Sequence, residues 1–362
     1  MDQPQICLNM IVKNEAAIIE KCLASMIGVI NCYVICDTGS TDNTVEIITS
    51  FFQGHEIPGE IVHTVFKDFS QSRNEALSAA QNSSLDFDYI LLCDADMEMQ
   101  VLSPDWNTAL IGKAYMIEQR TSSGLEYPNW RMVQKNLSCK YVGVTHEHLD
   151  TQGAPRMLLP GLVFIDHATG SNRAEKYDRD IRLLTGGLKA DPNNSRYMFY
   201  LGNSYLESGK FHEAIDCYQK RITMDGYNEE VFICKYRIGK AYALLGEEAH
   251  FIKQMLDTFD EFPDRAEPIY TVANQSLSKC QYRLALGFAE MGMQVPKPVS
   301  KLFVEGDVYD WRLSDIAAVA LYWLGRPAEA LNINLAIIDI VPSEHLERIA
   351  ENIKFCESKL GV

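Results

Sequence analysis

DYILLCDADMEM, residues 88–99, joins a short apolar run to a pair of aspartates. Tyr89–Cys93 are mostly apolar, which predicts a buried strand in a largely parallel sheet. Asp94 and Asp96 follow with one residue between them, and side chains at this spacing point to the same side of an extended segment. Open α/β sheets bind their ligands at the carboxyl ends of strands. The stretch therefore predicts a ligand site built on two carboxylates.

Two carboxylates this close raise each other's pKa unless a cation lies between them. Ligand sets made only of oxygen favour a hard divalent ion such as Mg²⁺ or Mn²⁺. Such an ion could neutralise a diphosphate. A solvated acidic turn is the alternative, because a single Asp-x-Asp is a common short motif. The rest of the chain has to decide between the two interpretations.

Length and composition indicate a globular protein of about two domains, since the chain has 362 residues with 47% hydrophobic and 23% charged side chains. The formal net charge of −16 argues against nucleic acid and anionic membranes as partners, because both require a basic surface. Residues 1–5 lack the pattern of a signal peptide, and no apolar run approaches the roughly 20 residues of a membrane span. A cytoplasmic location is expected.

The ten cysteines are scattered and include no Cys-x-x-Cys pair. Many of them lie in apolar runs. Reduced, buried cysteines are therefore expected in place of disulfides or a zinc site.

Strands and helices alternate through the first quarter of the chain. Apolar runs predict strands over 6–12, 32–36, 60–66 and 89–93, and segments with helical periodicity separate them, the third of which Ser70 is expected to cap. This order is typical of a parallel sheet with right-handed crossovers. Polar residues gather after each strand, at 13–15, 37–42, 68–73 and 94–96, so they should meet at one edge of the sheet. No Gly-x-Gly-x-x-Gly or Gly-Lys-Ser/Thr motif is present, which disfavours a dinucleotide enzyme and a P-loop ATPase.

Four of these segments, Ile6–Glu15, Cys36–Thr44, Phe69–Leu77 and Cys93–Met99, together resemble the family-2 glycosyltransferases of the GT-A fold. The resemblance covers roughly residues 6 to 170. It implies a Rossmann-like mixed sheet and transfer of a sugar from a nucleoside diphosphate, with a UDP-sugar as the expected donor and Mn²⁺ or Mg²⁺ as the cofactor. Ala114–Glu118 and Asn129–Gln134 fit further strands, some antiparallel, on the acceptor side.

The resemblance also implies roles for individual residues. Asp37 would contact the nucleoside, and Arg73 would lie against the base or the phosphates. Asp94 and Asp96 form the expected DXD motif and would hold ribose and metal, with Asp96 as the more direct ligand. The expected nucleotide-binding residues are Val12, Asn14, Glu15, Asp37, Arg73, Asp94 and Ala95.

A catalytic base and a third metal ligand are expected further along. An inverting displacement needs a carboxylate near the acceptor nucleophile. The resemblance implies Glu147, between two histidines, because related enzymes place an acidic residue after the Asp-x-Asp and before a final metal histidine; Glu98 and Asp105 are alternatives. His167 follows the predicted strand 158–165 and resembles the histidine that completes the metal site in many GT-A enzymes, giving Asp94, Asp96 and His167 as the ligand set. His146 and His148 are rivals for that place.

The second half of the chain is helical. Arg173–Asp180 is expected to open a helix on which Lys176 or Arg179 could reach the diphosphate, although a solvated face is the simpler interpretation. Beyond it, units match the tetratricopeptide pattern, with Gly202, Tyr205, Gly209, Ala214 and Tyr218 in the first, Gly239, Tyr242 and Gly246 in the second, and Ala318, Leu321, Gly325 and Ala330 in a later one. A degenerate unit around Gln281–Met293 fits between the last two. A generic helical domain is the alternative.

The sequence thus predicts an α/β GT-A domain, residues 1–170, followed by an all-α tetratricopeptide-like domain, residues 171–362. The expected activity is metal-dependent, inverting glycosyl transfer to a peptide, a protein or a glycan, since repeat arrays of this kind bind extended peptides. Homo-oligomers through the repeats are possible. A nucleotidyltransferase and a non-catalytic repeat scaffold are the rival functions.

Overall fold

The computed structural model describes residues 3–121, 126–167, 169, 176–299 and 301–361. The chain divides into two compact units, Met1–Gly187 and Leu188–Val362. Helix α4 (Lys176–Ala190) runs across this division. Residues 170–175, where the sequence predicts the start of that helix, lie outside the described residues.

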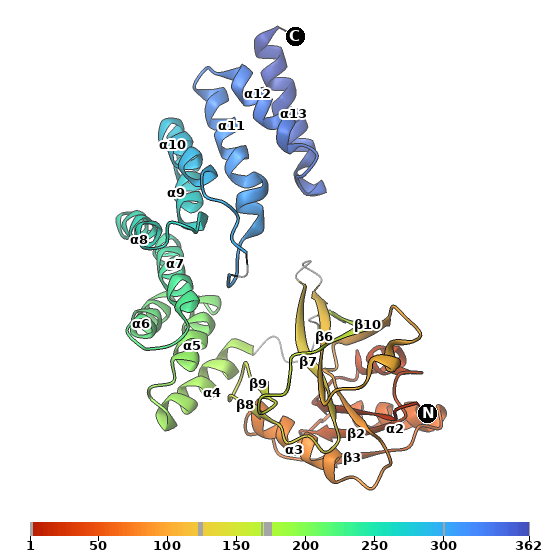
Figure 1. Cartoon of the computed structure of the whole chain (residues 1–362). Helices are drawn as coiled ribbons and strands as arrows, with labels where there is room; N and C mark the ends of the chain where they lie inside the picture. Colours follow the sequence, from red (N-terminus) through yellow and green to blue (C-terminus); the bar gives the residue numbers. More distant parts are fainter. Residues whose placement is uncertain (1–2, 122–125, 168, 170–175, 300, 362) are drawn as a thin grey trace. The chain divides into compact units, whose positions relative to one another are not determined.

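The first unit is built on an eight-stranded mixed sheet with the strand order β3-β2-β1-β4-β7-β6-β10-β5 (Figure 1). The strands are β1 (Ile6–Val12), β2 (Cys32–Asp37), β3 (Gly59–His63), β4 (Tyr89–Leu92), β5 (Met97–Val101), β6 (Ala114–Thr121), β7 (Glu126–Gln134) and β10 (Leu158–Asp166). The first four are parallel neighbours. Strand β7 runs antiparallel to both β4 and β6. The predicted mixed α/β sheet is confirmed.

Helices cover both faces of the parallel half. Helices α1 (Ile19–Met26) and α2 (Thr44–Gly54) pack on one face, where Leu23 and Phe52 join the same apolar cluster as Leu8 of β1. Helix α3 (Phe69–Asn82) packs on the other face through Leu77 and Ala80. Burial on both faces explains why the central strands are almost continuously apolar.

Two local features differ from the sequence-based expectation. The segment after Asp96 forms β5, which turns back to pair antiparallel with β10, so the two aspartates lie in the turn between β4 and β5. Strand β5 has only five residues, and its pairing with β10 is a long-range contact that a local pattern does not reveal. Helix α3 is capped by Asp68 instead of Ser70, because the Asp68 carboxylate accepts the Gln71 N–H.

A short 3-10 helix and a small hairpin complete the first unit. The 3-10 helix is η1 (Trp106–Ala109), and the hairpin pairs β8 (Lys140–Val142) with β9 (His148–Asp150). Strand β8 contacts α3, and this contact brings the loop between β8 and β9 close to the edge of the sheet that carries Asp94.

The second unit is all-helical, and each helix from α5 to α13 contacts the next. The helices are α5 (Ser195–Glu207), α6 (Phe211–Ile222), α7 (Asn228–Leu244), α8 (Glu248–Glu261), α9 (Glu267–Ser278), α10 (Tyr282–Met293), α11 (Leu313–Trp323), α12 (Pro327–Ile337) and α13 (Ser343–Leu360), with a π-helical turn at Val308–Arg312. Small residues lie where paired helices touch, and a Cβ added at Gly202 would come within 2.6 Å of the Tyr218 ring. The predicted tetratricopeptide-like organisation is confirmed.

The turns between paired helices explain why the repeat around Gln281–Met293 is degenerate in sequence. Gly209 and Gly246 end α5 and α7 with φ of +76°, and Gly325 ends α11 with φ of +80°. In the pair α9–α10 this left-handed position is filled by Cys280, with φ of +58°. The repeat is therefore present in the fold and lacks only its glycine.

Replacing Cys280 with glycine should stabilise the protein, because a side chain in the left-handed region costs about 1 kcal/mol that glycine avoids. The expected gain in the free energy of unfolding is about 0.5–1 kcal/mol, measured by urea unfolding followed by circular dichroism. Gly246→Ala, the reverse change in a matching turn, should destabilise by about 1 kcal/mol. Equal stability of wild type and Cys280→Gly would contradict strain at this turn.

Cys280 should also react faster with thiol reagents than the other cysteines. All ten cysteines are free, and Cys280 is the exposed one. Burial raises the pKa of Cys36, Cys139 and Cys217 to about 11, which suppresses their thiolates at neutral pH. Brief treatment of the native protein with iodoacetamide, read by peptide mass spectrometry, should modify Cys280 first. Earlier labelling of one of the other nine would contradict the structure.

Within the described part of the chain, no helix combines the length and the apolar character needed to cross a membrane.

Candidate active site

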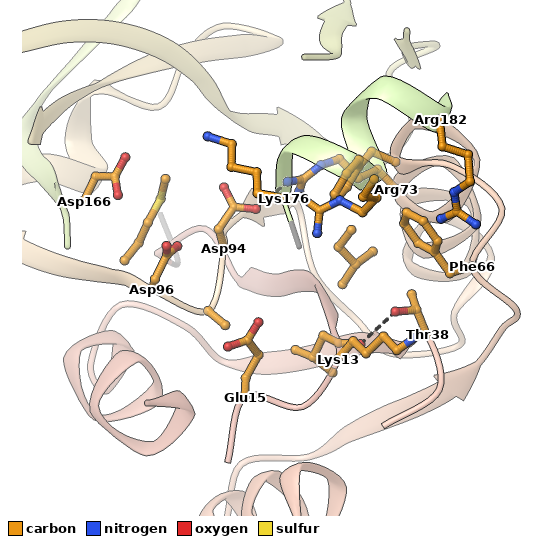
Figure 2. A pocket seen from close by; sticks show the side chains of 16 residues that line it. Lys13, Glu15, Thr38, Phe66, Arg73, Asp94, Asp96, Asp166, Lys176 and Arg182 are labelled. Atoms are coloured by element: carbon orange, nitrogen blue, oxygen red, sulfur yellow. Dashed lines mark hydrogen bonds and ion pairs between the residues drawn. The ribbon is translucent and has the colours of Figure 1, made fainter. Parts of the chain in front are cut away.

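A pocket of about 480 Å³ opens at the carboxyl ends of the parallel strands, within the first unit (Figure 2). It draws its walls from the ends of β1, β2 and β10, the β4–β5 turn, α3 and α4. The lining residues are Ile11, Val12, Lys13, Glu15, Thr38, Phe66, Phe69, Arg73, Asp94, Ala95, Asp96, Met97, Asp166, Lys176, Arg179 and Arg182. The expected meeting of polar side chains at this edge of the sheet is therefore present.

Asp94 is clamped between two arginines. Its Oδ1 accepts a hydrogen bond from Arg73 Nη2 at 2.5 Å, and its Oδ2 accepts one from Arg131 Nη1 at 3.0 Å. Burial opposes ionisation of this carboxyl, but the charges of Arg73 and Arg131 outweigh it and hold the pKa of Asp94 well below its usual range. Asp94 is therefore ionised at neutral pH and has both oxygens engaged by protein.

Three elements that are distant in the sequence build this clamp. Asp94 follows β4, Arg131 lies on the antiparallel neighbour β7, and Arg73 lies on α3. Arg131 is also held by Gln119, whose Oε1 accepts from its Nε at 3.2 Å. The ring of Phe164 lies 5.7 Å from the Arg131 guanidinium carbon.

Glu147, the expected base, contacts the far side of Arg73. Its Oε1 accepts from Arg73 Nε at 2.6 Å, and its side chain is 12% exposed. The loop that carries it is fixed to α3 by Asn74, which bonds to both backbone groups of Tyr141. Glu147 is not among the pocket-lining residues in the described part of the chain. Its contact makes it a support for Arg73.

The expected metal ligands are separated. Asp96 lines the pocket, whereas His167 points to Glu98, with Nε2 2.8 Å from Glu98 Oε2 and 3.3 Å from Lys21 Nζ. The residue before it, Asp166, lines the pocket instead, as expected from the alternation of side chains at the end of a strand. Among the described residues, no group of three or more His, Cys, Asp or Glu side chains is arranged to hold a metal.

The alternatives to these residues lie elsewhere. His148 is exposed on β9, and His146 Nε2 lies 3.9 Å from Asp180 Oδ2. Asp105 is exposed before η1, and Glu98 is paired with Lys21 at 2.9 Å. The described lining of the pocket includes none of the four.

On the nucleotide side, Val12, Glu15, Arg73 and Ala95 line the pocket as expected. Asn14 has φ of +56°, and its Oδ1 accepts the Thr41 N–H at 2.7 Å. Asn14 therefore ties the turn after β1 to the turn after β2.

Asp37 is buried beneath the second of these turns. Its carboxylate accepts the N–H groups of Gly39 and Ser40 at 3.2 and 3.1 Å, and His63 Nδ1 lies 3.3 Å away. Its neighbour Thr38 reaches the pocket. Asp37 shapes the turn that would present a nucleoside-binding surface.

Lys13, Thr38 and Phe69 line the pocket and lie in segments expected at this edge, although the sequence gave them no individual role. Sequence reasoning missed Phe66, Asp166 and Arg182, and it considered contact of Lys176 or Arg179 with the diphosphate less likely than a solvated helix face. A signal existed for α4, since its basic residues recur every three positions and so share one helix face. No sequence pattern predicted that this face of the helix would line the pocket.

Comparison with known proteins adds the family. Residues 7–120 match the model of glycosyl transferase family 2. The chain contains a family-2 glycosyltransferase domain. Over 238 residues it is 27% identical to the SPbeta prophage-derived glycosyltransferase SunS of Bacillus subtilis, an alignment that covers 61% of this chain and 54% of that protein. The chain thus spans about half the length of this curated relative.

Other similarities concern repeat proteins. A TPR repeat-containing protein of Synechococcus elongatus is 38% identical over 96 residues, which is 26% of this chain and 21% of that protein. The C-terminal part of a TPR repeat-containing protein from Cytophaga hutchinsonii has a TM-score of 0.42 and 12% identity, covering 52% of this chain and 68% of that one.

The arginine clamp leads to a stability prediction. Asp94→Asn leaves Arg73 and Arg131 without their shared charge, and the loss of hydrogen bonds between charged groups at this partly buried site costs about 1.5–3 kcal/mol. Urea unfolding at pH 7 should show this loss, whereas Asp105→Asn, at an exposed site, should change stability by less than about 0.5 kcal/mol.

The loss should also depend on pH in a defined direction. Because the folded pKa of Asp94 lies below the unfolded value of about 3.9, its contribution is complete above about pH 4 and disappears as the pH falls towards the folded pKa. The difference between wild type and Asp94→Asn should therefore shrink only below about pH 4. Equal stabilities at pH 7 would contradict the clamp.

Proposed function

We propose that this protein transfers a sugar from a nucleoside-diphosphate donor, expected to be a UDP-sugar, to an acceptor nucleophile. One observation carries the proposal: in a chain whose residues 7–120 match the family-2 model, one pocket at the strand ends combines basic side chains with the carboxylates of the Asp-x-Asp turn. The basic groups suit a diphosphate, and the carboxylates suit a metal or a sugar hydroxyl.

The donor would lie along the carboxyl ends of β1, β2 and β4. Thr38 and the turn fixed by Asp37 offer hydrogen-bonding groups for the nucleoside, and Phe66 offers an aromatic surface at the same end of the pocket (Figure 2). Glu15 and Asp94 lie between that end and Asp96. This arrangement supports a nucleoside at the Thr38 end and a sugar at the Asp166 end.

A divalent metal fits this pocket in a limited way. Asp94 is a poor ligand, because both of its oxygens accept hydrogen bonds from arginines. Asp96 and Asp166 both line the pocket and supply hard oxygen donors. Mg²⁺ is commonly bound by one or two carboxylates together with substrate phosphates, so Asp96 and Asp166 are the residues that would hold Mg²⁺ or Mn²⁺. Bound there, the ion would supply charge stabilisation to the departing diphosphate.

The chemical step is a displacement at the anomeric carbon. The acceptor nucleophile forms a bond to that carbon, the bond from the carbon to the diphosphate oxygen breaks, and the nucleoside diphosphate leaves with the bonding electrons. The acceptor's proton passes to a carboxylate. Inversion at the anomeric carbon is proposed by analogy with the family-2 resemblance.

Glu147 is proposed here to act through Arg73 and not as the base. A base must lie within hydrogen-bond reach of the acceptor, and the pocket-lining carboxylates Glu15 and Asp166 are better placed for this. Glu147 instead fixes Arg73, which in turn fixes Asp94.

The acceptor is proposed to be a peptide, a protein or a glycan. The helical repeats support a polypeptide, because arrays of this kind present extended binding surfaces. The similarity to the glycosyltransferase SunS supports glycosyl transfer and leaves the choice of acceptor to the repeats.

Isothermal titration of the full chain with UDP, GDP and their sugars, with and without Mn²⁺, tests the donor proposal. Wild type should bind one nucleoside diphosphate in a metal-dependent way, and Asp96→Ala should weaken that binding at least about tenfold, a loss of about 1.4 kcal/mol. Asp105→Ala serves as the control. If no nucleotide binds with or without metal, the transferase proposal fails and the repeat scaffold becomes the better interpretation.

Glu147→Gln separates the two roles of Glu147. A positioning role predicts weaker nucleotide binding, because Arg73 loses a charged partner, together with a lower transfer rate. A base predicts normal nucleotide binding with transfer almost abolished. The structure leads us to expect the first result, with donor affinity lowered about tenfold, since a hydrogen bond between charged groups contributes about 1.5–3 kcal/mol.

A further inference from the structure

We infer that α4 supplies the anion-binding wall of the pocket, with Lys176 and Arg179 binding the diphosphate of the donor. The inference rests on the proposed function, and it adds the protein groups that hold the leaving group. It involves a helix that lies outside the segment matched by the family model, which ends at residue 120.

The basic residues of α4 lie on one face of the helix. Lys176, Arg179 and Arg182 are spaced three apart, and all three line the pocket. Figure 2 shows Lys176 extending towards Asp94, whereas Arg182 lies beside Phe66 at the other end. Of Lys176 and Arg182, Lys176 is therefore the one on the side of the Asp-x-Asp turn, where a metal-bound diphosphate would lie.

Arg179 has a hydrogen-bond donor that lacks a partner. Among the described residues its buried Nε has no hydrogen-bond partner, and the carboxylate oxygen Asp180 Oδ1 lies 3.6 Å from it. A buried donor left unsatisfied costs roughly 1–3 kcal/mol. The Arg179 side chain is 20% exposed and lines the pocket, so an anionic oxygen that enters there meets its exposed part, while the shielded Nε gains a partner only if the side chain shifts.

The side chain of Arg179 is also held in place before a ligand arrives. Its guanidinium carbon lies 4.9 Å from the centre of the Phe69 ring, and Phe69 lines the same pocket. Contact with an aromatic face restricts the arginine to few conformations. Less conformational entropy is then lost when an anion binds.

The helix is anchored on the first unit by a buried acid. Asp180 is 2% exposed and accepts a hydrogen bond from Thr145 Oγ1 at 3.2 Å. Thr145 belongs to the loop that carries Glu147, which holds Arg73. The wall formed by α4 is therefore fixed to the same framework as the Asp94 clamp.

The charged side chains of α4 favour binding of an anion over binding of a cation at this wall. The chain has a formal net charge of −16, yet this side of the pocket presents basic side chains. Arg73 is already engaged by Asp94 and Glu147. Within the described residues, Lys176 and Arg182 form no ion pair with a carboxylate, so their charges are available to a ligand.

The test is titration of the full chain, in the presence of Mg²⁺, with UDP and with inorganic pyrophosphate, which reports anion binding without a base. The double variant Lys176→Gln/Arg179→Gln should lose at least about tenfold in affinity for both probes. Lys189→Gln removes the same charge from an exposed position in the last turn of α4 and should stay within about twofold of wild type.

Two further variants guard against misfolding. Lys176 is exposed, so Lys176→Gln alone should keep the thermal unfolding midpoint of wild type and still weaken both probes. Arg179→Lys keeps the charge but removes the planar guanidinium group, and it should recover only part of the affinity that Arg179→Gln loses.

The outcomes distinguish this inference from the proposed function. If wild type binds UDP and the double variant binds it equally well, the α4 inference is wrong and the transferase proposal stands. If wild type binds pyrophosphate through Lys176 and Arg179 but binds no nucleotide, the anion wall stands and the nucleotide proposal fails. If wild type binds neither probe, both are wrong.

Discussion

The carboxylate of Asp94, held between Arg73 and Arg131, is the interaction on which the candidate site depends. It joins the end of β4 to β7 on one side and to α3 on the other. A partly buried carboxylate would be costly to keep ionised alone, and the two arginines would repel each other without it. The three charges therefore require one another, and together they hold the β4–β5 turn, with Asp96, at the base of the pocket.

The same set of contacts extends to the last element of the first unit. Arg73 donates a hydrogen bond to Glu147. Thr145, in the same loop as Glu147, donates one to the buried Asp180 of α4. The β4–β5 turn at the bottom of the pocket and the basic wall on α4 are thus linked by one continuous set of contacts. A ligand that binds to the α4 face would act on a helix that continues into the second unit, because α4 crosses the division at Gly187.

Local patterns in the sequence predicted much of the fold. Apolar runs predicted the strands of the parallel half, and turn glycines predicted the helical repeats. Both patterns depend only on residues that are close together in the chain. The Cys280 turn shows the limit of such signals, since the backbone there adopts the glycine conformation without the glycine. Strand β5 was missed for a related reason, because its partner β10 lies more than 50 residues away.

The arrangement of the candidate site was predicted less completely, and the differences have a common cause. Asp94, Asp96 and Arg73, which lie at the ends of predicted elements, line the pocket as expected. The direction of His167 could not be deduced, since adjacent residues at a strand end point to opposite faces and only the register decides between Asp166 and His167. Likewise the partner of Glu147 depends on how β8 and α3 pack. Charged residues on a helix also look solvated until the packing of that helix is known.

A crystal structure of the full chain with a nucleoside diphosphate and Mn²⁺ tests the central claim most directly. The geometry described here predicts the diphosphate in the pocket, with an oxygen within hydrogen-bond distance of the Arg179 guanidinium, and the metal on Asp96 while Asp94 stays bound to Arg73 and Arg131. A nucleotide bound outside this pocket, or one whose diphosphate lies away from both Asp96 and α4, would contradict it.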